Sequence, residues 1–139
     1  MQIRAFEKND TQAVVDLWRE VGLTRDWNDP HRDIERKLQI QPELFLVAVD
    51  DQQRVLGTLM AGYTGFRGWI NYMAVKSEHQ SSGIGRELMM VARQKLLAMG
   101  CAKINLQVRQ DNEQVVQFYK SIGFSEDPVL SMGMRLIED

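Results

Sequence analysis

The sequence predicts a single α/β domain built on a mixed sheet, and two patterns point to that fold class. Three apolar runs joined by short polar links are typical of an antiparallel meander. A strand, an amphipathic helix and another strand follow, an order that places two strands parallel in one sheet. At 139 residues the chain is long enough for one core and too short for two.

The first third of the chain favours one strand and two helices. Ile3–Phe6 is a short strand candidate, and Asp10 is a candidate N-cap for a helix that ends near Gly22. Asp29 is a candidate cap of a second helix, which would have Pro30 at its first position and end before Pro42.

The middle of the chain changes to strand periodicity. Leu44–Val49 is a continuous apolar run of the kind that forms a buried strand, and Asp50–Gln53 is a turn candidate. Val55–Tyr63 and Trp69–Val75 complete the expected meander.

The last part of the chain alternates between the two types of element. Gly83–Met99 and Asn112–Ile122 have helical apolar spacing, whereas Lys103–Val108 and Val129–Ile137 have the pattern of strands. These ranges add up to a mixed sheet of six strands with four helices.

Composition excludes several classes of function. Seventeen basic against nineteen acidic residues leave a net charge of −2, without the basic excess expected of a general nucleic-acid binder. The single cysteine, Cys101, excludes a disulfide framework, and His31 and His79 lack the company of other metal ligands, so we expect no metal site. No apolar run approaches the roughly twenty residues that span a bilayer, and Met1–Asp10 lacks the apolar core of a signal peptide. We expect no membrane association and a cytoplasmic location.

A loop with two glycines carries the main functional signal. Gly83 and Gly85 lie between the strand Trp69–Val75 and a long helix, where they remove side chains that would keep a ligand from the backbone. The first amides of a helix have no partner within it and carry partial positive charge. Together with Arg86 they predict a pocket for a phosphate or diphosphate.

Two common phosphate-binding motifs do not fit this loop. The P-loop signature is absent. The dinucleotide fingerprint needs a third glycine where Leu88 stands, and an acidic residue about twenty positions on, where Lys103 to Asn105 stand.

Two separated motifs in the chain resemble those of the GNAT (GCN5-related N-acetyltransferase) superfamily. The first is Gln80-x-x-Gly83-x-Gly85 after a strand that ends in Ala74-Val75, and the second is Asn112 followed by Val116, Phe118-Tyr119 and Gly123-Phe124. Trp27–Pro30 with Asp33–Lys37 is similar to YpeA-type bacterial members. The resemblance implies one GNAT domain over residues 1–139, with six to seven strands, about four helices and a splay between the fourth and fifth strands.

The resemblance also implies acetyl-CoA as the donor, and it assigns residues to its binding. The diphosphate would lie against the loop, whose residues are Gln80, Ser81, Ser82, Gly83, Ile84, Gly85 and Arg86. The pantetheine arm would pair with the strand end formed by Met73, Ala74 and Val75. Backbone groups there need partners, and an N–H of this strand would stabilise the oxyanion.

Asn112 and Tyr119 are seven positions apart, nearly two helical turns, so both can face one ligand. By the resemblance, Asn112 contacts the coenzyme arm and Tyr119 protonates the departing thiolate as the general acid. The implied reaction is direct attack of a neutral amine on the thioester. It requires no nucleophile from the enzyme, so Cys101 is given no role.

The sequence identifies neither the acceptor substrate nor the general base. Glu78, His79, Asp111 and water are all candidate bases. Gln107 stands where the branch that acetylates ribosomal-protein N-termini has a glutamate, which disfavours that substrate. Trp27, Asp29, Asp33 and Glu35 fall where the family builds its acceptor rim. The alternatives to an enzyme are a non-catalytic acyl-CoA sensor and an interaction module, and family members often form homodimers.

Overall fold

The computed structural model describes all residues, 1–139. Its regular elements are β1 (Gln2–Ala5), α1 (Thr11–Glu20), α2 (Pro30–Leu38), β2 (Phe45–Val49), β3 (Val55–Tyr63), β4 (Arg67–Val75), α3 (Ile84–Ala98), β5 (Lys103–Leu106) and α4 (Glu113–Ser121). Short 3₁₀ turns precede α1, β2 and α3. These elements confirm the predicted mixed fold with four helices. No helix in the structure has the length and apolar character needed to cross a bilayer.

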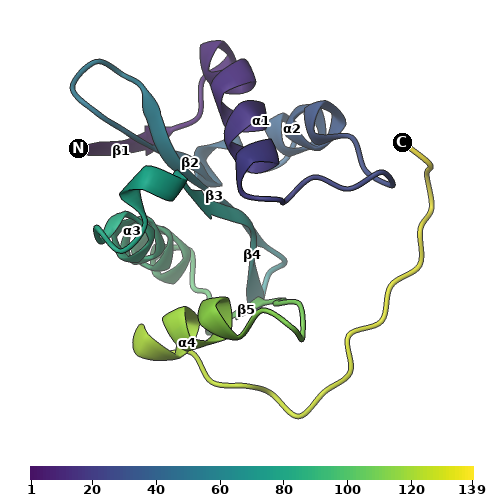
Figure 1. Ribbon diagram of the computed structural model, residues 1–139. Coiled ribbons are helices and arrows are strands. Elements are labelled where there is room, and N and C mark those ends of the chain that lie inside the picture. The colour runs from purple at the N-terminus through teal and green to yellow at the C-terminus, as the bar shows by residue number, and fades with distance from the viewer.

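The sheet has five strands in the order β1-β2-β3-β4-β5. Neighbouring strands are antiparallel from β1 to β4, and β4 pairs with β5 in parallel through the α3 crossover. The meander and the parallel pair are therefore where the sequence placed them. Helices α1 and α2 cover one face of the sheet, whereas α3 and α4 cover the other (Figure 1).

The two faces of the sheet each support a core, which explains the continuous apolar run formed by Leu44 and β2. Leu44, Leu46 and Ala48 pack toward α3, while Phe45, Val47 and Val49 pack toward α1. All six are essentially inaccessible to solvent. A strand that is buried on both faces shows no polar alternation, because both sets of side chains must be apolar.

Asp10 precedes α1 as expected, but it does not cap the helix with its side chain. Its carboxylate instead accepts two hydrogen bonds from Arg4, at 2.9 and 3.0 Å, and one from the Glu7 amide at 2.8 Å. The buried carboxylate therefore ties β1 to the start of α1. By contrast, Asp29 caps α2 as predicted, since it accepts a hydrogen bond from the His31 amide at 2.9 Å.

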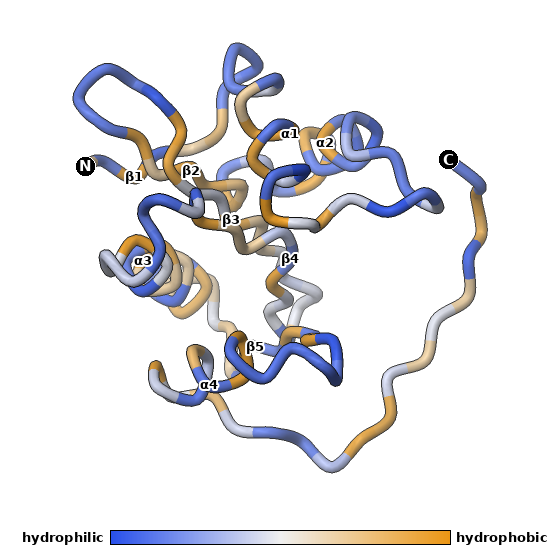
Figure 2. Tube along the Cα trace, in the orientation of Figure 1, coloured by the Kyte–Doolittle hydropathy of each residue, from blue (hydrophilic) through white to orange (hydrophobic).

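The prediction of six to seven strands is wrong, because Val129–Ile137 does not form a strand. The segment leaves α4 and runs outside the sheet to end beside α2 (Figure 1). Its apolar side chains are 62 to 90 % exposed, and Figure 2 shows them as orange patches far from the sheet. Alternating hydrophobicity shows how a strand would present its two faces, but it does not provide the neighbouring strand that a ladder requires.

Candidate active site

The loop before α3 leaves a row of backbone amides free. Gly83 is the N-cap residue, in the left-handed conformation at φ 92°, and no side chain caps the helix. The Ser82 amide donates to the His79 carbonyl at 3.3 Å. The amides of Gly83, Ile84, Gly85 and Arg86 donate to no backbone or side-chain acceptor in the structure. Helix starts are ordinarily satisfied by a side-chain cap, so this one is open to an external anion.

The two glycines of the loop serve different purposes. A Cβ on Gly83 would have no heavy atom within 4 Å, so the space beside it is open. A Cβ on Gly85 would lie 3.1 Å from the Phe118 ring of α4, which makes Gly85 a close-packing position between two helices. The sequence favours the interpretation that both glycines let a ligand approach the backbone. The surroundings of Gly83 fit this interpretation, and those of Gly85 do not.

The side chains of the loop mostly bind the loop itself. The Gln80 amide group donates to the Val75 carbonyl at 3.3 Å, joining the loop to the end of β4. The Ser82 hydroxyl donates to the His79 carbonyl. Ser81 adopts a left-handed conformation at φ 68° and is exposed. Arg86 is also exposed and makes no ion pair, so its guanidinium is free to meet an anion.

β4 has a free edge next to this loop. It pairs with β5 only from Arg67↔Lys103 to Ile70↔Leu106, and no strand runs along that side of residues 71–75. The gap places the end of β4, including Met73, Ala74 and Val75, beside the point where the parallel pair separates. This is the splay between the fourth and fifth strands that the resemblance implied. Backbone groups on such an edge are available to an extended ligand.

A bulge at Tyr72 shapes the same part of β4. Thr58 pairs with Ala74 and Met60 with Asn71, so two β4 residues, Tyr72 and Met73, face one β3 residue. Tyr72 takes the left-handed conformation at φ 50°. The Thr58 hydroxyl donates to the Tyr72 carbonyl at 2.8 Å and accepts from the Trp18 indole N–H at 2.9 Å. Bulges re-aim side chains near functional sites, and this one is held by a buried hydrogen-bond chain.

The hydroxyl of Thr58 could have been noticed as a polar side chain in the apolar run Val55–Tyr63. We expect Thr58→Val to lower the free energy of unfolding by about 2 to 4 kcal/mol, because it leaves the Trp18 indole and the Tyr72 carbonyl without this partner in the core. Urea denaturation measures the change. The exposed Thr64→Val serves as a control and should cost less than about 1 kcal/mol. Equal losses for the two variants would contradict the pinned bulge.

α4 and its N-cap carry the two residues of the second motif that are expected to act, Tyr119 and Asn112. Tyr119 is 8 % exposed and belongs to the core cluster that includes Ile70 of β4 and Ile84 of α3. Its ring meets Phe118 and Phe124 edge to face, and no protein group accepts from or donates to its hydroxyl. Burial raises the pKa of Tyr119 to about 12, so the hydroxyl keeps its proton throughout the neutral range.

Asn112 is the N-cap of α4. Its side-chain oxygen accepts from the Val115 amide at 3.4 Å, which leaves the side-chain NH₂ free for another partner.

None of the acidic or basic residues weighed as general bases is buried. Glu78 is 69 % exposed and lies 3.7 Å from the Lys76 ammonium and 3.8 Å from His79. Asp111 is exposed and makes no ion pair. Gln107, which follows β5, donates to the Ser131 hydroxyl.

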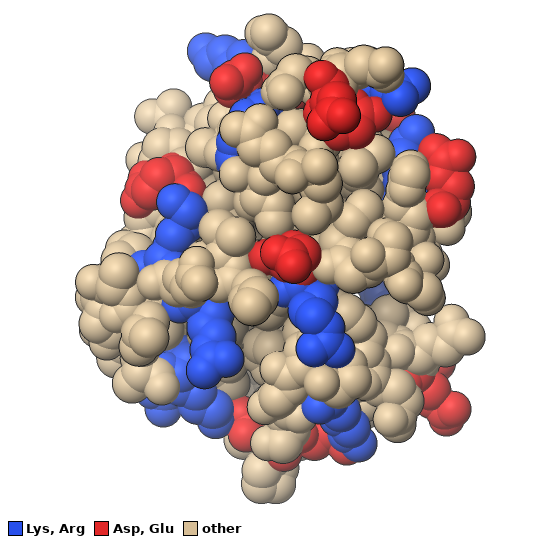
Figure 3. Space-filling view, turned by 90° about the vertical axis from the view of Figure 1, so that its left-hand side faces the viewer, with Lys and Arg blue, Asp and Glu red and all other residues tan.

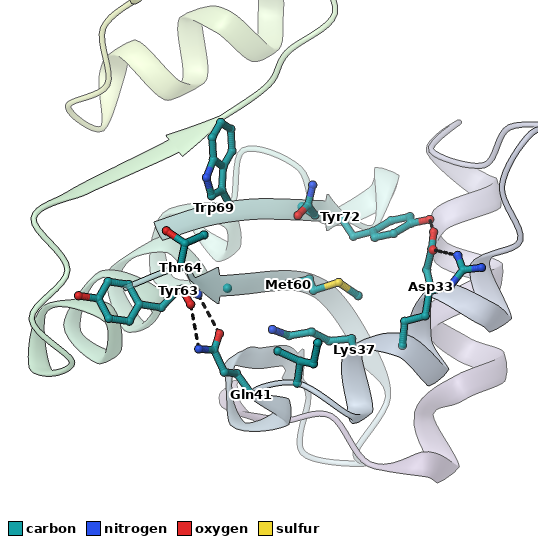
Figure 4. A pocket seen from close by; sticks show the side chains of 12 residues that line it. Asp33, Lys37, Gln41, Met60, Tyr63, Thr64, Trp69 and Tyr72 are labelled. Atoms are coloured by element: carbon teal, nitrogen blue, oxygen red, sulfur yellow. Dashed lines mark hydrogen bonds and ion pairs between the residues drawn. The ribbon is translucent and has the colours of Figure 1, made fainter. Parts of the chain in front are cut away.

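A cavity of about 490 Å³ lies between α2 and the strands β3 and β4 (Figure 4). Its wall combines aromatic rings with charged groups: Asp33, Arg36, Lys37, Ile40, Gln41, Met60, Gly62, Tyr63, Thr64, Trp69, Asn71 and Tyr72. The cavity borders β4 at Trp69, Asn71 and Tyr72, whereas the open loop before α3 follows the last residue of β4, Val75. Of the four residues expected at an acceptor rim, only Asp33 lines this cavity, whereas Trp27, Asp29 and Glu35 do not.

A hydrogen-bond network closes one end of the cavity. The Tyr72 hydroxyl donates to Asp33 at 2.6 Å, and the Asn28 side-chain amide donates to both Tyr72 and Asp33, at 2.9 and 3.2 Å. Burial and the Asp33 carboxylate raise the pKa of Tyr72 well above its usual value. At the opposite end, Gln41 exchanges two hydrogen bonds with the Tyr63 backbone, which joins the segment between α2 and β2 to the end of β3.

The comparison with known families decides what this scaffold is. The model of the acetyltransferase (GNAT) family matches residues 11–124, most of the chain. The chain belongs to the GNAT family of acetyltransferases. This GNAT domain is 45 % identical to an acetyltransferase of Sodalis glossinidius (strain morsitans), over all of this chain and 98 % of the relative. It is 42 % identical, with the same coverage, to an acetyltransferase of Pectobacterium atrosepticum.

Solved GNAT structures agree with the fold. Ard1 from Thermoplasma volcanium superposes with a TM-score of 0.77 at 26 % identity, covering 89 % of this chain and 82 % of that one. An aminoglycoside 6′-N-acetyltransferase from Acinetobacter haemolyticus superposes with a TM-score of 0.76 at 18 % identity, covering 99 % and 100 %. At that identity the second likeness shows the fold alone. These relatives support acetyl transfer by this GNAT domain and identify no acceptor.

Proposed function

We propose that this domain binds acetyl-CoA along β4 and the start of α3, and that it transfers the acetyl group to an amine held in the cavity beside α2. The open start of α3 carries the proposal, because the amides of residues 83–86 lack both a side-chain cap and an internal partner. A diphosphate is the group that such an arrangement binds best.

Charge near the loop favours the same ligand. α3 carries Arg86, Arg93 and Lys95 against one acidic residue, Glu87. Figure 3 shows the side of the molecule on which α3 lies, and blue basic side chains gather over its lower half. The chain as a whole has a net charge of −2, so this is a local excess that would attract a polyanion to one side of the domain.

The free edge of β4 fits the amide-bearing arm of the coenzyme. Residues 71–75 have a neighbouring strand on the β3 side only, so an extended ligand could add as a strand on the other side. When bound, acetyl-CoA supplies the thioester whose acetyl group moves to the amine. The bulge at Tyr72 and Met73 turns the backbone at that point, and it is held by Thr58.

The α4 residues complete the proposed site. Tyr119 keeps its proton at neutral pH and has no protein partner, so it can donate that proton to the leaving sulfur. Asn112 has its side-chain oxygen engaged in the helix cap, and its NH₂ group is left to hold the coenzyme arm. Because Glu78 and Asp111 are exposed surface groups, we assign removal of the amine proton to solvent.

The experiment that tests this function measures binding and turnover separately. Calorimetry with acetyl-CoA should show binding, and a library of amines should give acetyl-CoA-dependent mass gains of one acetyl group together with release of free thiol. Binding without thiol release from any amine would support a non-catalytic sensor. Absence of binding would mean that the loop has a structural role only.

A further inference from the structure

Asp139 occupies a site built for a carboxylate alongside α2, between the N-cap residue Asp29 and Arg36 of the last turn. Its side chain is 1 % exposed, and its two oxygens receive hydrogen bonds from Arg36 at 2.6 and 3.1 Å and from the Asp29 amide at 3.1 Å. The Arg32 guanidinium lies 3.9 Å away. The hydrogen bond from Arg36 is the main reason that the pKa of Asp139 falls to about 2. A forked guanidinium is the side chain best suited to hold a carboxylate by two parallel bonds.

Arg36 connects this carboxylate site to the cavity. The same side chain lines the cavity together with Asp33 and Tyr72, and it lies 3.0 Å from Asp33. In Figure 4 the Tyr72 ring points to Asp33 at one end of the cavity, and Arg36, the ion-pair partner of Asp33, lines the cavity as well. A carboxylate that replaced Asp139 on Arg36 would therefore lie at the end of the cavity, with the rest of its molecule free to extend toward β4.

Asp139 belongs to a weakly held segment after α4, residues 125–139, which we call the tail. No hydrogen bond or ion pair joins residues 132–138 to the rest of the domain, and the apolar side chains among them are 62 to 90 % exposed. Ordering each residue costs about 1 to 2 kcal/mol of backbone entropy. Burial offsets little of that cost here, so Asp139 can be displaced by a competing carboxylate without loss of a packed element.

The charged groups of the cavity favour an anionic ligand. The Lys37 ammonium points into the cavity and donates only to the Ala61 carbonyl, and burial lowers its pKa. When Asp139 leaves, Arg36 and Lys37 face a single carboxylate in the cavity wall, that of Asp33.

We propose that the acceptor is an amine that also carries a carboxylate, that Arg36 binds this carboxylate, and that Asp139 is an internal competitor for the same site. The inference rests on the proposed function, because it uses the assignment of the cavity as the acceptor site. Bound this way, an amino-acid-like acceptor would be anchored at α2 while its amine reaches along the cavity toward the β4 bulge. The tail then restrains turnover until enough acceptor is present to displace it.

The binding test needs neither acetyl-CoA nor turnover. Glutarate, a dicarboxylate without an amine, is titrated into ¹⁵N-labelled protein while the Nε–H signal of Arg36 is followed. Asp139→Asn should bind glutarate about tenfold more tightly than the unchanged protein, because loss of one charge-assisted competitor is worth about 1.4 kcal/mol. Glu126→Gln, which removes another tail carboxylate paired with Lys120, is the matched control and should change nothing. Arg36→Gln should abolish the response, and Arg36→Lys should restore part of it.

The activity test compares amines with and without a carboxylate, such as alanine with alaninamide and glycine with glycinamide. The carboxylate member should be acetylated preferentially, and Asp139→Asn should lower its KM severalfold while kcat stays the same. Equal glutarate affinity with and without Asp139, or preference for the amide member of each pair, would overturn the inference. Acetyl-CoA calorimetry on the same variants reports on the proposed function separately, since glutarate can bind Arg36 even if acetyl-CoA does not bind.

Discussion

Gly83→Trp should reduce the affinity for acetyl-CoA by about 100-fold or more, because loss of two charge-assisted hydrogen bonds of about 1.5 kcal/mol each is sufficient. The indole would occupy the open space beside Gly83, in front of the free amides of residues 83–86. Calorimetry measures the affinity, and circular dichroism with thermal unfolding verifies that the fold persists. An affinity within a factor of three of the unchanged protein would mean that the diphosphate does not lie there.

The control must reproduce the backbone strain of the substitution. Any L residue at φ 92° costs about 1 to 2 kcal/mol. Gly65 in the turn between β3 and β4 has φ 107° and equally open surroundings, so Gly65→Trp carries the same strain away from the loop. It should lower stability by a similar amount and leave acetyl-CoA affinity unchanged. Gly85→Trp is a poor test, since its side chain would collide with Phe118 and disturb the packing of α3 on α4.

Tyr119→Phe should lower kcat by about 100-fold, the scale of one general acid, and leave the affinity for acetyl-CoA almost unchanged. Its hydroxyl has no protein partner, so the ring of the variant keeps the edge-to-face contacts with Phe118 and Phe124. Steady-state kinetics with the amine found in the library screen measures the change. An unchanged kcat would remove Tyr119 from the mechanism.

The pH profile offers a further check on the same residue. Because burial raises the pKa of Tyr119 to about 12, its proton is present at all pH values below that and is lost only above it. The rate should therefore rise with pH as the amine loses its proton, and it should show no decline attributable to Tyr119 up to about pH 11. A decline near pH 10 that disappears in Tyr119→Phe would show that the hydroxyl titrates like a solvated tyrosine.

The elements with strong local signals could be predicted from the sequence. The range 83–99 became α3 (Ile84–Ala98), and 103–108 became β5, two residues shorter. Each of these ranges has its own periodicity, and the helical range is bounded by Gly83 and Gly100, so local rules are sufficient. The GNAT family could also be identified, because both of its motifs are continuous stretches of sequence.

The predictions that were wrong or missing concern features that depend on contacts between segments far apart in the chain. Val129–Ile137 alternates like a strand, yet its end is drawn to α2 by Asp139 and Arg36, a pair that lies 103 positions apart in the chain. Gly85 resembled a ligand-facing glycine because Phe118, which packs against it, lies on another helix. The cavity could not be predicted either, since its wall joins α2 to β3 and β4 and the bulge at Tyr72 leaves no mark in the sequence.

The most direct test of the account follows the backbone amides of residues 83–86 by ¹H–¹⁵N correlation during titration with acetyl-CoA and, in parallel, with pantetheine, which lacks the diphosphate. The account predicts large downfield shifts of these amides with acetyl-CoA and small ones with pantetheine, while residues 71–75 respond to both. Amides of residues 83–86 that stay in place while acetyl-CoA binds elsewhere on the domain would contradict it.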